Sequence, residues 1–282
     1  MNSYRDFVAA SAKLFQQGKI IVPTATPRPP KKLAPDAPVA LIFSPHPDDE
    51  CIVGGLPLRL AQETGMRVVN VAVTLGSDKK RRTARLRELK NACAALGFEL
   101  EQSAPGGLEH IDPETRKTNP KAWAFAVKVI AAILTEYQPR IVFFPHDDDH
   151  HPTHIGTHHL VMDALKMLPK NFGCVLVETE FWGQMTTPNL LVESSIEDVG
   201  ALANALALHV GEVRRNPYHL RLPAWLQDNV RRGAELIGGK GGHAPSFLFG
   251  TLYQIRRWKK HAVHAYWMTG KMISVKAPLN FR

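Results

Sequence analysis

Short apolar runs alternate with longer segments of mixed polarity between residues 39 and 180, and this rhythm constrains the fold more than any other feature. The apolar runs at 39–43, 66–74, 141–144 and 174–180 have the length and β-branched content of buried strands. A short third strand is expected at 98–102. Helical spacing predicts helices in the segments between them, at 50–64, 81–96, 119–137 and 154–167. Strands and helices in this order form right-handed βαβ units. The sequence therefore predicts an α/β fold, a Rossmann-like three-layer αβα sandwich with a mostly parallel sheet.

Segments on both sides of this core predict extensions rather than further domains. Residues 4–17 have helical spacing and a broad apolar face, and the Pro-rich stretch 24–38 predicts an extended tether. We expect a single catalytic domain over 39–282, with a core at 39–180 and C-terminal additions at 181–282. These additions include helices at 195–210 and 223–236 and a late strand at 247–258. The apolar face of the first helix is suited to docking on a second subunit, which makes a homo-oligomer one expectation.

Composition narrows the class of protein. A hydrophobic content of 44% is enough to bury a core. No stretch reaches the roughly 20 apolar residues of a membrane span, and residues 1–19 lack the apolar centre of a signal peptide. We therefore expect no membrane span and a cytoplasmic location. The three cysteines, Cys51, Cys93 and Cys174, are too few and too widely spaced for a disulfide framework.

The formal charge of +9 is spread over short basic groups, for example at 79–82 and 256–260. Such groups bind anions or form ordinary solvated surface. No nucleic-acid-binding module accompanies them, so solvated surface is the favoured interpretation and no nucleic acid partner is expected. The group at 79–82 follows a predicted strand, where it could steer an anionic substrate.

Two polar loops follow predicted strands and carry the chemistry. The first is PHPDDE at 45–50, and the second, at 146–159, contains six histidines and three aspartates. Loops at the C-terminal ends of parallel strands are where open α/β sheets bind their ligands. Imidazoles and carboxylates are the ligands that Zn²⁺ prefers. The sequence therefore predicts a metal site where the loops meet, with zinc as the expected ion and another divalent metal as the alternative.

The spacing within the loops suggests a division of roles. His46 and Asp49, three residues apart on a turn, can face one ion, while Asp48 points elsewhere and is left as a general base. We expect His154 as the third ligand and His158, four residues later, as its rival. His151 would stand beside the metal as an imidazolium that stabilises the oxyanion and protonates the leaving amine.

Simpler interpretations exist for several of these residues. Asp48 or Asp49 could merely cap a helix, although capping does not explain the histidines. Asp149 is spaced for a hydrogen bond that orients His151, and Glu50 is expected behind the ligands or against substrate. Arg85 is either a helix-surface residue paired with Glu88 or Glu50, or a group that binds a substrate phosphate or hydroxyl. His146, His150 and His159 are expected to be bystanders.

These motifs resemble the zinc-dependent de-N-acetylases called LmbE-like or PIG-L-like. The resemblance rests on PHPDDE at 45–50 and on Asp149-x-His151-Pro152-x-His154, with support from residues 74–76 and 85–97. It implies that His46, Asp49 and His154 hold zinc, that Asp48 is the general base and that His151 assists at the oxyanion or leaving group. Thr153 stands where the family usually has aspartate, so a carboxylate from 147–149 is expected to orient the neighbouring imidazole instead.

The sequence thus predicts a zinc-dependent deacetylase that removes an N-acetyl or related N-acyl group from an amino sugar or its conjugate, which could be anionic. Another zinc amidase or esterase on the same scaffold is the nearest alternative. A catalytically weakened metal-binding protein that holds an anionic glycan or nucleic acid is the alternative from a different class.

Overall fold

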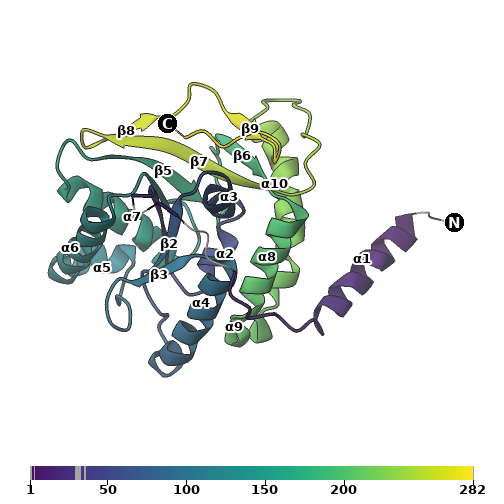
Figure 1. The fold of residues 1–282 in the computed structure, drawn as a ribbon, viewed down its shortest axis with the longest axis horizontal. Helices are drawn as coiled ribbons and strands as arrows, with labels where there is room; N and C mark the ends of the chain where they lie inside the picture. Colours follow the sequence, from purple (N-terminus) through teal and green to yellow (C-terminus); the bar gives the residue numbers. More distant parts are fainter. Residues whose placement is uncertain (1, 3, 29–32, 35, 282) are drawn as a thin grey trace.

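The computed structural model describes residues 2, 4–28, 33–34 and 36–281, and the predicted tether at 24–38 lies partly outside them. Within the described residues nine strands form one sheet (Figure 1). Eight strands form a path in the order β3 (Glu99–Gln102), β2 (Arg67–Ala72), β1 (Val39–Ser44), β4 (Ile141–Pro145), β5 (Gly173–Thr179), β7 (Gly250–Lys259), β6 (Leu190–Glu193) and β9 (Lys271–Ile273). The ninth strand, β8 (Ala262–Ala265), pairs with β7.

The five strands of the core are parallel, and β7 of the C-terminal additions joins their edge in the antiparallel direction. β3, β2, β1, β4 and β5 pair in parallel, whereas β7 runs antiparallel to β5 and β6 antiparallel to β7. The predicted mostly parallel sheet is therefore confirmed. The late strand predicted at 247–258 is β7, and its partners β6, β8 and β9 were not predicted.

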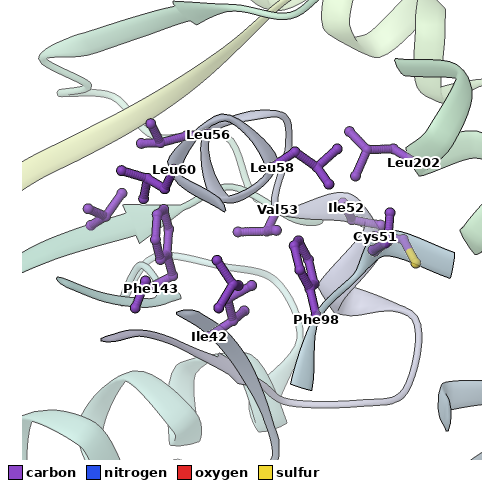
Figure 2. Close-up of a cluster of buried hydrophobic side chains, with 14 of the residues drawn as sticks. Ile42, Cys51, Ile52, Val53, Leu56, Leu58, Leu60, Phe98, Phe143 and Leu202 are labelled. Carbon is purple, nitrogen blue, oxygen red and sulfur yellow. The ribbon is translucent and has the colours of Figure 1, made fainter. Parts of the chain in front are cut away.

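Helices cover both faces of the sheet, because alternate strand residues point to opposite sides. Ala40 and Ile42 of β1 join one buried cluster, and Leu41 and Phe43 join the other. The first cluster, shown in Figure 2, is covered by α2 (Asp49–Ile52), α3 (Leu56–Glu63), α4 (Arg82–Leu96), α8 (Ile196–Ala207) and α10 (Leu222–Leu236). The second is covered by α6 (Pro120–Tyr137) and α7 (Pro152–Met167), with α5 (Pro113–Thr118) packed on both helices. The three-layer prediction is confirmed.

The strand order reverses direction between β1 and β4, and this reversal positions the site. The chain moves outward from β1 through β2 to β3, then returns to place β4 on the other side of β1, with Leu41 opposite Val142. Loops that leave such a switch point diverge and open a crevice at the C-terminal edge of the sheet. The loops after β1 and β4 are the two polar loops at 45–50 and 146–159.

One predicted helix is wrong as a single element. Residues 50–64 form two helices, α2 and α3, separated at Val53, Gly54 and Gly55. Gly54 has φ +86°, and a Cβ there would lie 2.3 Å from Thr251 Oγ1 of β7. The helix breaks because the backbone must approach β7 this closely. The short helix α5 was also not predicted.

The helix predicted at 4–17 is confirmed as α1 (Tyr4–Gly18), which extends away from the body in Figure 1. Its last turn lies against the body, where the Arg221 guanidinium lies 4.9 Å from the centre of the Phe15 ring. Phe7, nearer the N-terminus, is 72% exposed. No helix of the described residues has the length and apolar character needed to cross a membrane.

Candidate metal centre and catalytic site

Three predicted ligands meet where the loops after β1 and β4 converge. Asp49 Oδ2 lies 3.4 Å from His46 Nδ1 and 3.4 Å from His154 Nε2, and these two nitrogens lie 3.2 Å apart. Atoms bound roughly 2.0–2.1 Å from one tetrahedral ion lie about 3.3–3.4 Å from one another. The triangle therefore has the size that a zinc ion requires, although His46 and His154 are 108 positions apart in sequence.

Local backbone geometry fixes each member of the triangle. The His46 backbone N–H donates to Asp49 Oδ2 at 2.8 Å, which holds that carboxylate under the loop. His154 lies in the first turn of α7, which begins at Pro152, and its side chain is fully buried. Asp149 Oδ1 lies 3.5 Å from His154 Nδ1, on the far side of the ring from the triangle. A carboxylate behind a metal-binding imidazole fixes its orientation and tautomer.

The electrostatics of the triangle show that it is suited to a cation. Burial alone would raise the pKa of Asp49, but the His154 and His46 imidazoles outweigh it and hold that pKa well below its usual range. Burial alone would lower the pKa of His154, but Asp49 and Asp149 outweigh it and raise that pKa to about 9. Two buried carboxylates thus favour positive charge between them, which a proton on His154 or a metal ion would supply.

Asp48 lies beside the triangle with its carboxylate turned to other partners. Its φ of 117° is in the left-handed region, and its backbone N–H donates to Glu50 Oε2 at 2.9 Å. Asp48 Oδ2 accepts a hydrogen bond from the Tyr218 hydroxyl, and Asp48 Oδ1 lies 3.9 Å from Arg85. Burial, and next the Asp49 charge, raise the pKa of Asp48 to about 7. A carboxyl with a pKa near neutrality is suited to accept and return a proton.

His151 is next to the triangle but is not the expected imidazolium. Its ring centroid is 4.7 Å from that of His46, and its Nδ1 accepts the Thr153 backbone N–H at 3.2 Å. Burial, and next the His46 ring, lower the pKa of His151 to about 4. The ring is therefore neutral at pH 7, with Nε2 left to carry the proton. Asp149 accepts the backbone N–H of His151 at 2.8 Å rather than a ring N–H.

The remaining predicted residues divide into near and distant groups. Arg85 donates to the Pro47 carbonyl at 3.0 Å and lies 3.9 Å from Glu212, so it faces the site and not Glu88 or Glu50. His158 Nδ1 lies 3.0 Å from the Pro145 carbonyl oxygen and 3.7 Å from Glu178. His158, the expected rival ligand, is therefore held outside the triangle.

Two residues of the C-terminal additions complete the site, and sequence reasoning did not assign them to it. Tyr218, in the short 3₁₀ helix η2 (Tyr218–Leu220), contacts Asp48 from 170 positions away. His209 Nε2 lies 2.7 Å from Glu50 Oε1, and both side chains are fully buried. Glu50 thus links His209 to the Asp48 backbone. No spacing signal connects such distant residues, so neither pairing could be read from the sequence.

A cavity of about 580 Å³ opens over the triangle. The triangle and base contribute His46, Asp48 and Asp49 to its wall, and the 79–82 group contributes Lys79, Arg81 and Arg82. Arg81 and Arg82 are paired with carboxylates, at 2.9 Å from Glu212 and 2.5 Å from Glu109. The cavity is therefore polar and charged, and large enough for a sugar beside the triangle.

Comparison with known proteins relates the first half of the chain to amino-sugar deacetylases. Residues 41–165 match the family model described as PIG-L, GlcNAc-PI de-N-acetylase. A probable N-acetyl-alpha-D-glucosaminyl L-malate deacetylase 2 from Bacillus cereus is 29% identical over 143 residues, which cover 46% of this chain and 62% of that protein. A 1D-myo-inositol 2-acetamido-2-deoxy-alpha-D-glucopyranoside deacetylase from Thermomonospora curvata is 29% identical over 154 residues, which cover 45% and 52%.

Solved structures extend the likeness to more of the fold. The 4-carboxy-2-hydroxymuconate hydratase GalB from Pseudomonas putida superposes with a TM-score of 0.57 at 17% identity, covering 77% of this chain and 95% of that one. Because GalB is a hydratase, the shared fold does not decide the reaction. The sequence match contains both polar loops and spans less than half of the chain, and the chain covers less than two thirds of the two curated relatives. Residues 41–165 are therefore similar to the GlcNAc-PI de-N-acetylase family, PIG-L, also called LmbE-like.

Proposed function

We propose that this chain is a metal-dependent hydrolase that removes an N-acetyl or related N-acyl group from an amino sugar or its conjugate. The observation that carries the proposal is the triangle of His46, Asp49 and His154, with edges of 3.2–3.4 Å and a separate carboxylate beside it. The two deacetylase relatives support the substrate class.

The proposed ligands are His46, Asp49 and His154, with zinc as the ion that fits them best. The ring nitrogens of His46, His151 and His154 also lie within 4.8 Å of one another, which is an alternative ligand set. We favour Asp49 over His151 because its edges match tetrahedral coordination more closely. When bound, a divalent cation supplies Lewis-acid polarisation of the amide carbonyl and acidifies water.

The residues of the chain provide the proton transfers. Asp48 accepts a proton from the attacking water, while the Tyr218 hydroxyl keeps its carboxylate oriented. Neutral His151 donates its Nε2–H to the oxygen on which negative charge develops. Asp48 then returns the proton to the nitrogen, so that the C–N bond breaks and an amine and a carboxylate separate.

The test is acetate release from a panel of N-acetylated amino sugars by zinc-loaded protein. We expect release by the wild type and its loss in Asp48→Asn, with bound zinc unchanged. Metal analysis of His46→Ala and His154→Ala should show loss of zinc. Zinc-loaded protein that releases acetate from none of the sugars would overturn the proposal and favour a metal-dependent binding protein.

A further inference from the structure

Residues 4–22, here called the arm, hold an unusual share of the exposed apolar surface. Of the sixteen large apolar side chains that are exposed in the described chain, seven lie in the arm. Each is 63–84% exposed, and they are Tyr4, Phe7, Val8, Leu14, Ile20, Ile21 and Val22. At roughly 150 Å² for each side chain, the arm exposes about 800 Å² of apolar surface. The largest apolar patch of a typical monomer is smaller than this, so the arm is marked as an interaction surface.

The body of the protein holds the arm at its C-terminal end only. Among residues 4–18 of α1, Gly18 alone is buried, and a Cβ there would lie 2.6 Å from Leu220 Cδ2. The Thr24 backbone N–H donates to Asn204 Oδ1 at 2.8 Å. From this anchor the helix projects away from the body (Figure 1). An isolated helix of 15 residues is marginal in water, so a further surface is needed to stabilise it.

The apolar side chains of α1 lie on one face with a symmetric pattern of size. They recur at the three- and four-residue spacing of a helical stripe, and the stripe consists of Tyr4, Phe7, Val8, Ser11, Leu14, Phe15 and Gly18. Its centre, Ser11, is small and is flanked by Ala10 and Ala12. Large side chains lie on both sides of this centre. Two such helices can therefore approach closely at Ser11.

The opposite face of α1 favours a protein partner over a lipid surface. Helices that lie on membranes carry a polar face rich in lysine and arginine. The charged residues of α1 are Arg5, Asp6 and Lys13, which include an acid and amount to a net charge of +1. The face is therefore polar without being strongly cationic.

We propose that α1 pairs antiparallel with α1 of a second copy of this chain, around a two-fold axis at Ser11. In this register Tyr4 lies opposite Gly18 of the partner subunit, and Phe7 lies opposite Phe15 of the partner subunit. A large side chain thus meets the glycine that has none. Each contact occurs twice, as a two-fold interface requires.

The geometry and the area both suit such a pair. Because α1 projects from the body, an antiparallel pair keeps the two bodies at opposite ends of a helix about 22 Å long (Figure 1). Two arms together offer about 1,600 Å² of apolar surface, which is the size of a standard stable interface. The proposal is independent of the proposed hydrolase activity.

A cysteine at the two-fold axis tests the register. Ser11→Cys should form a disulfide between two full-length chains under mild oxidation, because the small residues at the centre let the helix axes approach to about 8 Å. The native cysteines Cys51, Cys93 and Cys174 are buried and should not contribute. The matched control is Ala9→Cys, on the polar face of the same helix. Non-reducing electrophoresis should show most of Ser11→Cys as a covalent dimer and little of Ala9→Cys.

The mass in solution tests the surface itself. At micromolar concentration, light scattering should give the wild type an even number of chains. Phe7→Glu combined with Leu14→Glu should halve that number, because the two charges would be buried in the pair. Both side chains are exposed in the single chain, so the body should keep its fold, as near-UV circular dichroism would verify. Lys13→Glu, on the polar face, should leave the mass unchanged.

Three results would each overturn the proposal. They are a monomeric wild type, an assembly that survives the Phe7→Glu and Leu14→Glu double substitution, and cross-linking of Ser11→Cys no greater than that of Ala9→Cys. Sedimentation of the protein with phosphatidylglycerol vesicles is measured in parallel. A monomer that sediments with these vesicles, and loses this property in the double variant, would assign the arm to a membrane surface instead.

Discussion

Asp48 and Asp49 are adjacent in sequence but direct their carboxylates to different partners. Asp49 Oδ2 lies 3.4 Å from both His46 Nδ1 and His154 Nε2, whereas Asp48 accepts a hydrogen bond from Tyr218. The positive φ of Asp48 turns the backbone between them. The two acids can therefore serve as ligand and base without competing for one ion.

This separation predicts that isosteric substitutions of the two acids affect different properties, catalysis for Asp48 and zinc binding for Asp49. Asp48→Asn should lower kcat by about 10²–10⁴-fold, because general acid–base catalysis contributes that much, and should leave zinc bound. Asp49→Asn should reduce bound zinc, since an amide oxygen is a weaker ligand. Steady-state kinetics and metal analysis of the two proteins check both. Loss of zinc from Asp48→Asn would contradict the assignment.

Removal of the Tyr218 hydroxyl should shift the pH dependence of activity. Its hydrogen bond favours the ionised form of Asp48 and thereby lowers the pKa of that carboxyl. In Tyr218→Phe the pKa of Asp48 should rise, so the acid limb of kcat/KM should move to higher pH. Activity should fall more at pH 6 than at pH 8. An unchanged profile would show that the hydroxyl does not act on the base.

Asp149 should influence metal affinity without being a ligand. Its carboxylate lies 3.5 Å from His154 Nδ1, on the side away from the triangle. Asp149→Asn should weaken zinc binding by about 10–100-fold, the usual effect of losing such a partner. Competition with a fluorescent zinc chelator measures this. The matched control is His159→Gln. His159 lies outside the triangle on α7, the helix that carries His154, and this variant should bind zinc as the wild type does.

The Glu50–His209 pair should stabilise the fold as well as the Asp48 turn. Both side chains are fully buried and lie 2.7 Å apart. His209→Ala should lower the free energy of unfolding by about 3–5 kcal/mol, because it leaves a buried carboxylate without its partner. Adding Glu50→Gln should recover part of this loss in urea unfolding. Fully additive losses would show that the two residues are not coupled.

Glu178 should make the fold less stable as pH rises. Burial outweighs the effect of Arg256 and raises the pKa of Glu178 from 4.5 to about 7. The stability that protonated Glu178 contributes is complete below about pH 4.5 and is lost as pH rises through about 7. The loss should reach up to about 3 kcal/mol. Urea unfolding at pH 5 and pH 8 should show less pH dependence in Glu178→Gln than in the wild type.

The sequence was most informative where signals were local. Apolar runs such as 141–144 predicted the core strands, because a buried parallel strand needs a continuous apolar segment. The strand order then brought together two loops that are distant in sequence. His46, Asp49 and His154 were predicted as neighbours on this basis, and the structure places them within 3.4 Å.

Long-range packing decided what the sequence could not show. The break between α2 and α3 depends on the contact of Gly54 with β7, which no local pattern reveals. Tyr218 and His209 reach the site from the C-terminal additions, where periodicity is weak. Burial, and next the His46 ring, lower the pKa of His151 to about 4, and neither influence can be read from the local sequence that suggested an imidazolium.

The left-handed backbone of Asp48 implies a conflict between folding and chemistry. Glycine adopts a φ of 117° without steric cost, whereas aspartate is strained there. Selection for thermostability alone would therefore favour Asp48→Gly. The aspartate at this position therefore lowers the stability of the protein but supplies a carboxylate that glycine lacks.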